Sequence, residues 1–382
     1  MAYFKMTSRV FTGSTALEDA APAMAELGSR VLIVTGPHVG RSPMMESLEK
    51  VLDGQKVAYA VFDGITGEPT EPMIAAGTEI FKKEKCDFVI GLGGGSPLDS
   101  AKAIAAMSVN PGKIPDYCGK EIGGSVPPIA AIPTTAGTGS ETTRFTVISD
   151  PVTDVKMLLR GDRLVPTVAV LNPAFTLQMP KSVTASTGLD ALTHAVEAYT
   201  SVKAMPFTDP YALSAVQLIM RNLPEAYKNG TSAEAREAMM TAAFEAGVCI
   251  NNSSVTLVHG MSRPIGALFH VPHGMSNAML LGVCLPFAKE GTPERFADLG
   301  RAIGAAGADT PDDEAGSLFL DKVNALVSCC EIPTLWEYGV DHDAFEKAIP
   351  KMASDAIASG SPGNTRRPMT AADCEALYRK LL

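Results

Sequence analysis

The chain has 382 residues, of which 46% are hydrophobic and 19% charged, and its formal net charge is −10. This length predicts two domains, because single hydrophobic cores stop growing at about 250 to 300 residues. The composition is too apolar for a disordered chain. No run of lysine and arginine is present that could neutralise phosphates, so we expect no nucleic-acid partner.

We expect neither a signal peptide nor a membrane helix. Residues 1–11 lack the apolar run of a signal peptide, and no stretch of about 18 apolar residues predicts a membrane helix. We therefore expect a soluble, cytoplasmic protein without a membrane partner. The seven cysteines include no C-x-x-C pair and are expected to be reduced and mostly buried, so any metal site must use histidine and carboxylate ligands.

The first part of the chain alternates strand and helix patterns. Short apolar runs predict buried strands at residues 30–35, 57–62, 88–92, 127–132 and 165–171. Helical patterns follow the first three runs, at residues 42–52, 71–83 and 97–107. This alternation predicts a parallel, doubly wound α/β sheet, which binds ligands at the carboxyl ends of its strands.

From about Pro180 onward the periodicity is mostly helical. The expected helices cover residues 187–199, 209–222, 233–251, 293–304, 312–329 and 372–382. We therefore predict an α/β domain over residues 1–182 and an all-helical domain over residues 183–382.

The segment TGLDALTHAVEAY at residues 187–199 is the first candidate for a functional site. It places Asp190 and His194 four residues apart, on the same face of a helix. A carboxylate and an imidazole so placed can bind one divalent cation. The alternative is an ordinary amphipathic helix with a solvated Asp190 and a packed His194.

A second histidine-rich segment contains His259, His270 and His273. It is too rich in glycine and proline to be one regular element, and Pro264 is expected to interrupt any helix that carries His259. His259 and His273 would complete a site of three imidazoles and one carboxylate with the earlier pair. Such a site accepts Fe(II) or Zn(II) and can leave a position open for a substrate.

Two polar loops follow strands of the predicted sheet. The first, GGGSP at residues 93–97, opens a helix and can cradle an anion, because glycine permits close approach and the helix N-terminus presents free N–H groups. It matches neither a P-loop nor a G-x-G-x-x-G fingerprint, and the alternative is a tight turn. The second loop supplies Thr134, Thr135 and Thr138, whose hydroxyls can donate to the same pyrophosphate. Together the loops favour a dinucleotide.

Four motifs in this order resemble the iron-containing (group III) alcohol dehydrogenases: GGGSPLDSAK, PTTAGTGSE, GLDALTHAVEAY and a pair of His-Gly dipeptides. The resemblance extends over nearly the whole chain, including PGNTRR near the C-terminus. It implies a dehydroquinate synthase-like architecture, with a Rossmann-like N-terminal domain, a helical C-terminal domain and, between them, a nicotinamide dinucleotide and one divalent metal. It also implies reversible interconversion of alcohols with aldehydes or ketones, and dimers or larger homo-oligomers.

The resemblance assigns roles residue by residue. The metal, expected to be iron with zinc as the alternative, would be bound by Asp190, His194, His259 and His273. The pyrophosphate side of the cofactor would meet Gly94, Gly95, Ser96 and Asp99. The residues that match other cofactor-lining positions are Thr134, Thr135, Thr138, Phe145, Val147 and Lys156.

The sequence departs from the family pattern four residues after His259. Many relatives carry there a second histidine, a proposed proton relay, and this chain has Arg263. Arginine does not shuttle protons near neutral pH, but it binds carboxylate, phosphate or sulfonate groups through two hydrogen bonds. We hypothesise that Arg263 selects an anionic substrate, and the alternative is an ion pair with a carboxylate such as Glu197. His270 is the candidate to replace the relay.

A second departure concerns the cofactor. NAD-preferring relatives often carry aspartate directly after the strand predicted at residues 30–35, where this chain has Gly36, and Arg41 is the only cation nearby. We therefore expect NAD, with NADP tolerated. The expected function is a metal-dependent, NAD(P)-linked alcohol dehydrogenase or aldehyde reductase for a small alcohol or aldehyde. The alternatives are a hydroxyacid–oxoacid transhydrogenase, a dehydroquinate-synthase-type lyase and a nucleotide-binding scaffold with a dead site.

Overall fold

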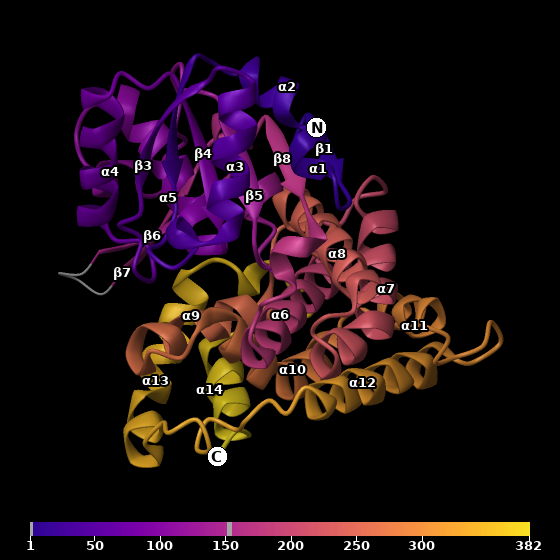
Figure 1. The fold of residues 1–382 in the computed structure, drawn as a ribbon. Coiled ribbons are helices and arrows are strands. Elements are labelled where there is room, and N and C mark those ends of the chain that lie inside the picture. Colours follow the sequence, from indigo (N-terminus) through magenta and orange to yellow (C-terminus); the bar gives the residue numbers. More distant parts are fainter. Residues whose placement is uncertain (1–2, 151–154) are drawn as a thin grey trace. The chain divides into compact units, whose positions relative to one another are not determined.

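The computed structural model describes residues 3–150 and 155–382, which form two compact units (Figure 1). The first unit spans Lys5–Gln178, and the second comprises Met179–Leu382 together with Tyr3 and Phe4. The first contains a parallel sheet flanked by helices and the second is helical, which confirms the predicted fold class.

The sheet of the first unit has six parallel strands. Their order is β1 (Arg9–Thr12), β8 (Val168–Leu171), β5 (Ile129–Pro133), β4 (Phe88–Gly93), β2 (Arg30–Val34) and β3 (Ala58–Phe62). The five apolar runs of the sequence correspond to the last five of these strands. The sequence pattern missed β1, because this four-residue edge strand is only half-buried and carries no continuous apolar run.

Helices cover both faces of the sheet. Successive side chains of a strand point to opposite faces, so each strand contributes to two hydrophobic cores. Val31 and Ile33 belong to the core on one face, with residues of α1 (Ala16–Asp19), α2 (Ala21–Ala25) and α3 (Pro43–Gly54). Leu32 and Val34 belong to the core on the other face, with residues of α4 (Glu71–Lys83) and α5 (Gly95–Val109). The strands are therefore apolar throughout rather than alternating.

The chain reverses its direction of crossover between β2 and β4. From β2 it passes to β3 on one side, and it then returns to place β4 on the other side of β2. Ligands of doubly wound sheets bind at such a point, outside the carboxyl ends of the strands. Gly36 follows β2 and Gly94 follows β4, so the residues expected to meet the cofactor lie at this position.

Helix α5 begins two residues earlier than predicted, at Gly95, so Pro97 lies inside its first turn. The preceding Gly93 has φ of +149°, a backbone conformation that side-chain-bearing residues rarely adopt. A Cβ atom on Gly91 would lie 3.0 Å from side-chain atoms of Leu98 and Ala101. These glycines thus bring the start of α5 close to the end of β4.

Two side chains of α5 hold a neighbouring segment in place. Asp99 accepts hydrogen bonds from Ser140 Oγ (2.6 Å) and from the Val147 backbone N–H (2.8 Å). The fully buried Lys102 donates to the carbonyl oxygens of Thr143 (2.8 Å) and Phe145 (2.9 Å). This segment leads into an antiparallel hairpin of β6 (Phe145–Asp150) and β7 (Val155–Arg160), so α5 fixes the hairpin that carries three expected cofactor residues.

The second unit is a helical array around α6. Its helices are α6 (Lys181–Thr200), α7 (Asp209–Lys228), α8 (Ala233–Ser253), α9 (Leu257–Phe269), α10 (His273–Lys289), α11 (Pro293–Ala302), α12 (Asp312–Cys329), α13 (His342–Ala358) and α14 (Ala371–Arg379). Helix α6 is buried on all sides from Gly188 to Thr200. A helix surrounded in this way belongs to the core, although its sequence also contains ionisable residues.

Several helix boundaries differ from the prediction. The expectation that Pro264 interrupts the helix carrying His259 is wrong, because α9 runs through it from Leu257 to Phe269. Helix α7 likewise continues through Pro224 to Lys228. Both prolines are inside amphipathic helices, where the burial of an apolar face offsets the lost backbone hydrogen bond. Helices α10 and α13 also contain proline and were not predicted.

The cysteines agree with the sequence-based expectation. All seven are free thiols, and five of them are buried, with Cys118 exposed and Cys329 half-buried. Among the helices of the described residues, none is both long and apolar enough to cross a membrane.

Glu141 lies beside the segment held by α5, and its burial makes stability depend on pH. It is 2% exposed, and burial raises its pKa to about 7. Burial also lowers the pKa of Lys102 to about 8, against the attraction of Asp99 and Glu141. The unfolded chain ionises Glu141 above about pH 4.5, so holding the buried carboxylate destabilises the fold increasingly as pH rises from 4.5 to 7.

We therefore expect Glu141→Gln to gain stability relative to wild type as pH rises through that window. The expected gain is on the order of 2 kcal/mol, because the amide stays neutral at all pH values. Urea unfolding at intervals from pH 4 to 8 measures it, with the exposed Glu121→Gln as the control. Parallel stability curves for wild type and Glu141→Gln would show that Glu141 titrates normally.

Candidate metal centre and cofactor loops

One face of the buried helix α6 is polar. Asp190, His194 and Glu197 lie at spacings of four and three residues, and their exposed fractions are 2%, 4% and 1%. Burying ionisable groups is costly unless they are paired or bind a metal. Because the other buried side chains of α6 are uncharged, this face marks a polar site within the core.

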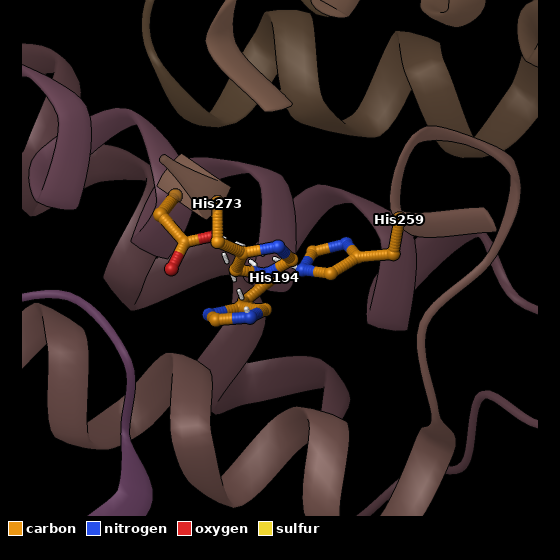
Figure 2. Close-up of side chains that lie close together, drawn as sticks. His194, His259 and His273 are labelled. Carbon is orange, nitrogen blue, oxygen red and sulfur yellow. Dashed lines mark ion pairs between the residues drawn. The ribbon is translucent and has the colours of Figure 1, made fainter. Parts of the chain in front are cut away.

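Two further helices bring imidazoles to the same place (Figure 2). His259 lies in the first turn of α9, and His273 is the first residue of α10. Asp190 Oδ1 lies 3.8 Å from His194 Nε2, 3.6 Å from His259 Nε2 and 3.8 Å from His273 Nε2. The rings of His194 and His259 are stacked, with centroids 4.7 Å apart.

The four side chains have the spacing of a metal site. Their ligand atoms all lie within 4.8 Å of one another. Separations of 3.6 to 3.8 Å are too long for hydrogen bonds, but they suit four ligands around one cation with bonds of about 2.0 to 2.2 Å. Three imidazole nitrogens and one carboxylate oxygen match the preferences of Fe(II) and Zn(II).

The electrostatics of the cluster also favour a cation. Burial opposes ionisation of Asp190, but His194 and His273 outweigh it and hold the pKa of Asp190 well below its usual range. Burial opposes protonation of His259, but Glu197 and Asp190 outweigh it and raise the pKa of His259. Two carboxylates in their charged form therefore face the imidazoles and attract positive charge. A divalent cation that binds here would displace protons from the imidazoles.

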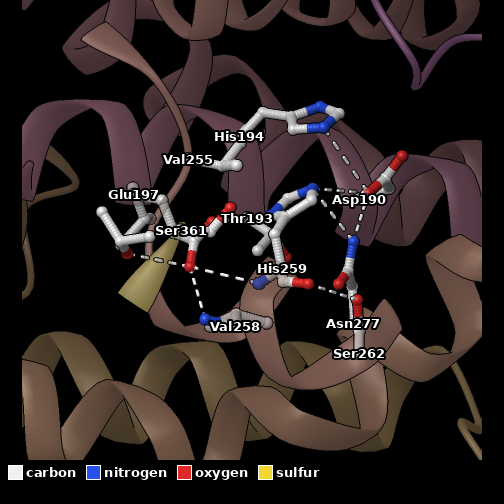
Figure 3. A network of polar contacts seen from close by, with 12 residues as sticks. Asp190, Thr193, His194, Glu197, Val255, Val258, His259, Ser262, Asn277 and Ser361 are labelled. Carbon is white, nitrogen blue, oxygen red and sulfur yellow. Dashed lines mark hydrogen bonds and ion pairs between the residues drawn. The ribbon is translucent and has the colours of Figure 1, made fainter. Parts of the chain in front are cut away.

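Glu197 orients His259 from behind (Figure 3). Its Oε2 lies 2.6 Å from His259 Nδ1, and its Oε1 accepts hydrogen bonds from Thr256 Oγ1 (2.9 Å) and the Val258 N–H (2.5 Å). It thus satisfies donors at the N-terminus of α9, which has no side-chain cap of its own. With Nδ1 bound to Glu197, His259 can direct an unprotonated Nε2 to a metal.

Three of the four side chains in the cluster are buried, and the fourth is partly exposed. The side chains of Asp190, His194 and His259 are at most 5% exposed, whereas that of His273 is 39% exposed. Solvent therefore reaches the cluster on the His273 side.

Glycines after His259 and His273 allow the helices to approach closely. A Cβ on Gly274 would lie 2.6 Å from the Ser186 carbonyl oxygen and 3.3 Å from Asp190 Cβ. A Cβ on Gly260 would lie 2.6 Å from the ring of Pro362. Contacts under 3.0 Å do not occur between real Cβ atoms and backbone, so α10 reaches α6 only because position 274 has no side chain.

Arg263 lies one helical turn after His259. Its Nη1 donates to Ser361 Oγ (2.9 Å), and no ion pair with a carboxylate forms among the described residues. The pairing with Glu197 considered as an alternative is absent, since Glu197 instead contacts His259 and the start of α9. His270 is exposed, has φ of 55° and ends α9, and it is not part of the four-residue cluster.

In the α/β unit the two polar loops meet. A Cβ on Gly94 would lie 3.3 Å from the Thr135 side chain, and one on Gly95 would lie 2.8 Å from that of Thr138. Thr134 is bonded through its backbone N–H to Gly93 (2.9 Å). Gly94 is the N-cap of α5, with Gly95 and Ser96 in its first turn, so the start of α5 lies beside Thr135 and Thr138.

The other residues expected to contact the cofactor form contacts within the α/β unit. Both carboxylate oxygens of Asp99 accept hydrogen bonds, one of them from the N–H of Val147. Phe145 and Val147 lie half-buried on β6, and Lys156 on β7 forms an ion pair with Glu68 (2.7 Å).

Packing explains why position 36 is glycine, which the sequence alone does not show. A Cβ at this position would lie 2.8 Å from the Ile65 carbonyl oxygen, so no side chain fits there. The residues that follow line a pocket of about 460 Å³ formed by Pro37, His38, Arg41, Ser42, Pro43 and Gln178. Arg41 and His38 are exposed beside the end of β2.

Several residues of these sites were missed from the sequence. Glu197 was considered only as a partner for Arg263, although it lies seven residues after Asp190 and hence on the same helix face. Lys102 lies three residues after Asp99 in the same way. Ser361 gave no signal, because its contact reaches a residue far away in the sequence. Asn277 was missed although it lies four residues after His273 and hence on the same helix face.

We expect Gly274→Ala to weaken metal binding at least tenfold. The new methyl group would push α10 away from α6 and move His273 from Asp190. The dissociation constant for Zn(II), measured by competition with a chelator, tests this, and Gly282→Ala is the control. A Cβ on Gly282, in the same helix, would meet only a side-chain atom of Asn324, at 3.3 Å. Unchanged affinity in Gly274→Ala would show that the close approach does not position His273.

Comparison with known families gives a match over nearly the whole chain. Residues 7–173 match the model of the family described as "Iron-containing alcohol dehydrogenase", and residues 184–382 match that of the "Fe-containing alcohol dehydrogenase family, C-terminal".

Individual relatives are similar along most of their length. The chain is 32% identical to a choline dehydrogenase of Bacillus subtilis over 94% of this chain and 90% of that protein. Among solved structures, a 1,3-propanediol oxidoreductase has 32% identity and a TM-score of 0.96, with both chains fully covered. The sulfoacetaldehyde reductase of Bifidobacterium kashiwanohense, solved with NAD+, has 27% identity and a TM-score of 0.87, covering 100% of this chain and 98% of that one.

The fold, the cluster of three histidines with one aspartate, and these matches agree, and the chain is an oxidoreductase that belongs to the iron-containing alcohol dehydrogenase family.

Proposed function

We propose that this protein is a metal-dependent, NAD(P)-linked alcohol dehydrogenase or aldehyde reductase. Its divalent cation, Fe(II) with Zn(II) as the alternative, would be held by Asp190, His194, His259 and His273. The observation that supports this most is the convergence of their four ligand atoms within 4.8 Å in a nearly buried site. When bound, the cation supplies a Lewis acid for the substrate oxygen, and the nicotinamide supplies or accepts the hydride.

The side chains around the proposed metal and cofactor sites are already arranged for binding. Glu197 holds His259 with its Nε2 directed at Asp190, so the ligand geometry is preorganised. The exposed side of His273 leaves an approach for a small alcohol or aldehyde. The N-terminus of α5 and the hydroxyls of Thr134, Thr135 and Thr138 suit the pyrophosphate of a dinucleotide.

We infer NAD as the cofactor, with NADP tolerated. The relative solved with NAD+ supports a nicotinamide dinucleotide. Position 36 has no acidic side chain that would repel a 2′-phosphate. The Ile65 carbonyl oxygen leaves no room for any side chain there. Arg41 and His38 line the adjacent pocket and carry the donors that a phosphate needs. The hairpin residues Phe145, Val147 and Lys156 would line the cofactor further along.

We also propose that the substrate carries an anionic group that Arg263 binds. Arg263 lies on the same face of α9 as His259, and its guanidinium has a hydroxyl rather than a carboxylate as its partner. Burial lowers the pKa of Arg263 despite the attraction of Glu197, so an anion would be a favourable further partner. A structural relative is named for sulfoacetaldehyde, an anionic aldehyde, whereas another relative is named for choline, a cationic alcohol.

Reconstitution of the apoprotein tests the proposed activity. With Fe(II) or Zn(II) added anaerobically, we expect aldehyde-dependent loss of NADH absorbance, and the same with NADPH at lower kcat/KM. Free NADH should accumulate when an alcohol is oxidised. Turnover that requires an oxo acid as acceptor, with no release of NADH, would instead indicate a transhydrogenase. An absence of turnover with either metal would contradict the dehydrogenase assignment.

Arg263→Gln tests the anionic substrate. We expect kcat/KM for sulfoacetaldehyde to fall about 10- to 100-fold, since a charge-assisted contact contributes roughly 1.5 to 3 kcal/mol. For propionaldehyde, a neutral aldehyde of similar length, kcat/KM should change less than threefold. Arg366→Gln, which alters an exposed arginine, is the control. Equal losses on both aldehydes would contradict a role in recognising the anion.

A further inference from the structure

The amide of Asn277 lies against the candidate metal centre. Asn277 follows His273 by one turn of α10 and is fully buried. Its Nδ2 lies 2.7 Å from Asp190 Oδ1 and 3.2 Å from His259 Nε2 (Figure 3). The same atom lies 3.3 Å from His273 Nε2. A single amide group thus faces three of the four candidate ligand atoms.

The three contacts of Nδ2 are not equivalent. The shortest reaches a carboxylate oxygen, which has lone pairs enough to bind a cation and accept a hydrogen bond at the same time. An imidazole nitrogen has one lone pair, which a cation would occupy. The contact that survives metal binding is therefore the one between Asn277 and Asp190.

The other end of the amide supports this orientation. Asn277 Oδ1 is buried and has no hydrogen-bond partner among the described residues. With the amide reversed, that oxygen would take the place of Nδ2, 2.7 Å from Asp190 Oδ1, and two oxygens would repel each other. The N–H donation to Asp190 therefore determines how the amide lies, at the cost of an unpaired carbonyl oxygen.

We propose that Asn277 is a positioning residue of the metal centre. Its N–H donates to the ligand oxygen of Asp190 and so holds the carboxylate toward the three imidazoles. Asn277 orients Asp190 in the same way that Glu197 orients His259. Each residue holds a candidate metal ligand and is not itself a ligand. The inference rests on the proposed metal centre, and it adds a residue on α10 whose loss lowers metal affinity. Changes of such outer partners typically cost 10- to 100-fold in affinity.

A double-mutant cycle with Asp190 tests this role. The quantity measured is the dissociation constant of the apoprotein for Zn(II), by competition with a chromogenic chelator. We expect Asn277→Leu, which is close in volume, to weaken binding 10- to 100-fold. In the Asp190→Ala background, where three imidazoles remain, the same change should alter affinity less than threefold. Asn222→Leu is the matched control, because the Asn222 amide bonds within its own helix, to the Leu218 carbonyl oxygen, and to no other described residue.

The outcomes separate the alternatives. Unchanged affinity in Asn277→Leu would overturn the inference. A loss that persists in the Asp190→Ala background would overturn it too, because Asn277 would then act independently of Asp190. Wild-type apoprotein that binds no zinc would overturn the metal centre and the inference with it. Thermal unfolding of each apoprotein checks folding, and Asn277→Ala replaces Asn277→Leu in the cycle if the larger side chain prevents folding.

Discussion

The helical unit depends on one constraint, which is that Asp190 and Glu197 are charged inside a helix buried on all sides. Neither carboxylate can be solvated there, so each needs partners from elsewhere in the chain. Helix α9 supplies them to Glu197 through its unsatisfied N-terminal donors and His259. Helix α10 supplies them to Asp190 through His273 and Asn277. The site and the packing of three helices are thus the same set of contacts, and disrupting one disrupts the other.

Much of this arrangement could be predicted from local patterns. The spacing of Asp190 and His194 places them on one face of any helix, and two more histidines next to glycine pointed to the rest of the cluster. Continuous apolar runs indicated buried parallel strands, and the glycine-rich turn after residues 88–92 located the start of a helix. These features depend on neighbours within a few residues, which is why sequence inspection was sufficient for them.

What could not be predicted depends on contacts between distant segments. Pro264 would end an isolated helix, yet α9 continues because its apolar face is buried by other helices. Gly36 looked like a missing acidic residue, whereas its neighbour Ile65 leaves no room for a side chain. Asn277 bonds to a residue 87 positions earlier, and no spacing rule links the two. Position in space, rather than residue type, gives these residues their roles.

The hydrogen bonds that Asp99 accepts and Lys102 donates divide the α/β unit into a part fixed to α5 and a part that can vary. The glycine turn, the threonine loop and the β6–β7 hairpin are all fastened to α5, so a substitution in any of them disturbs the others. The exposed residues after β2, including His38 and Arg41, have no such fastening to α5. Under the proposed placement of the cofactor, coenzyme preference can change through residues 37–43 while the part fastened to α5 stays unchanged, and directed evolution of that preference should begin there.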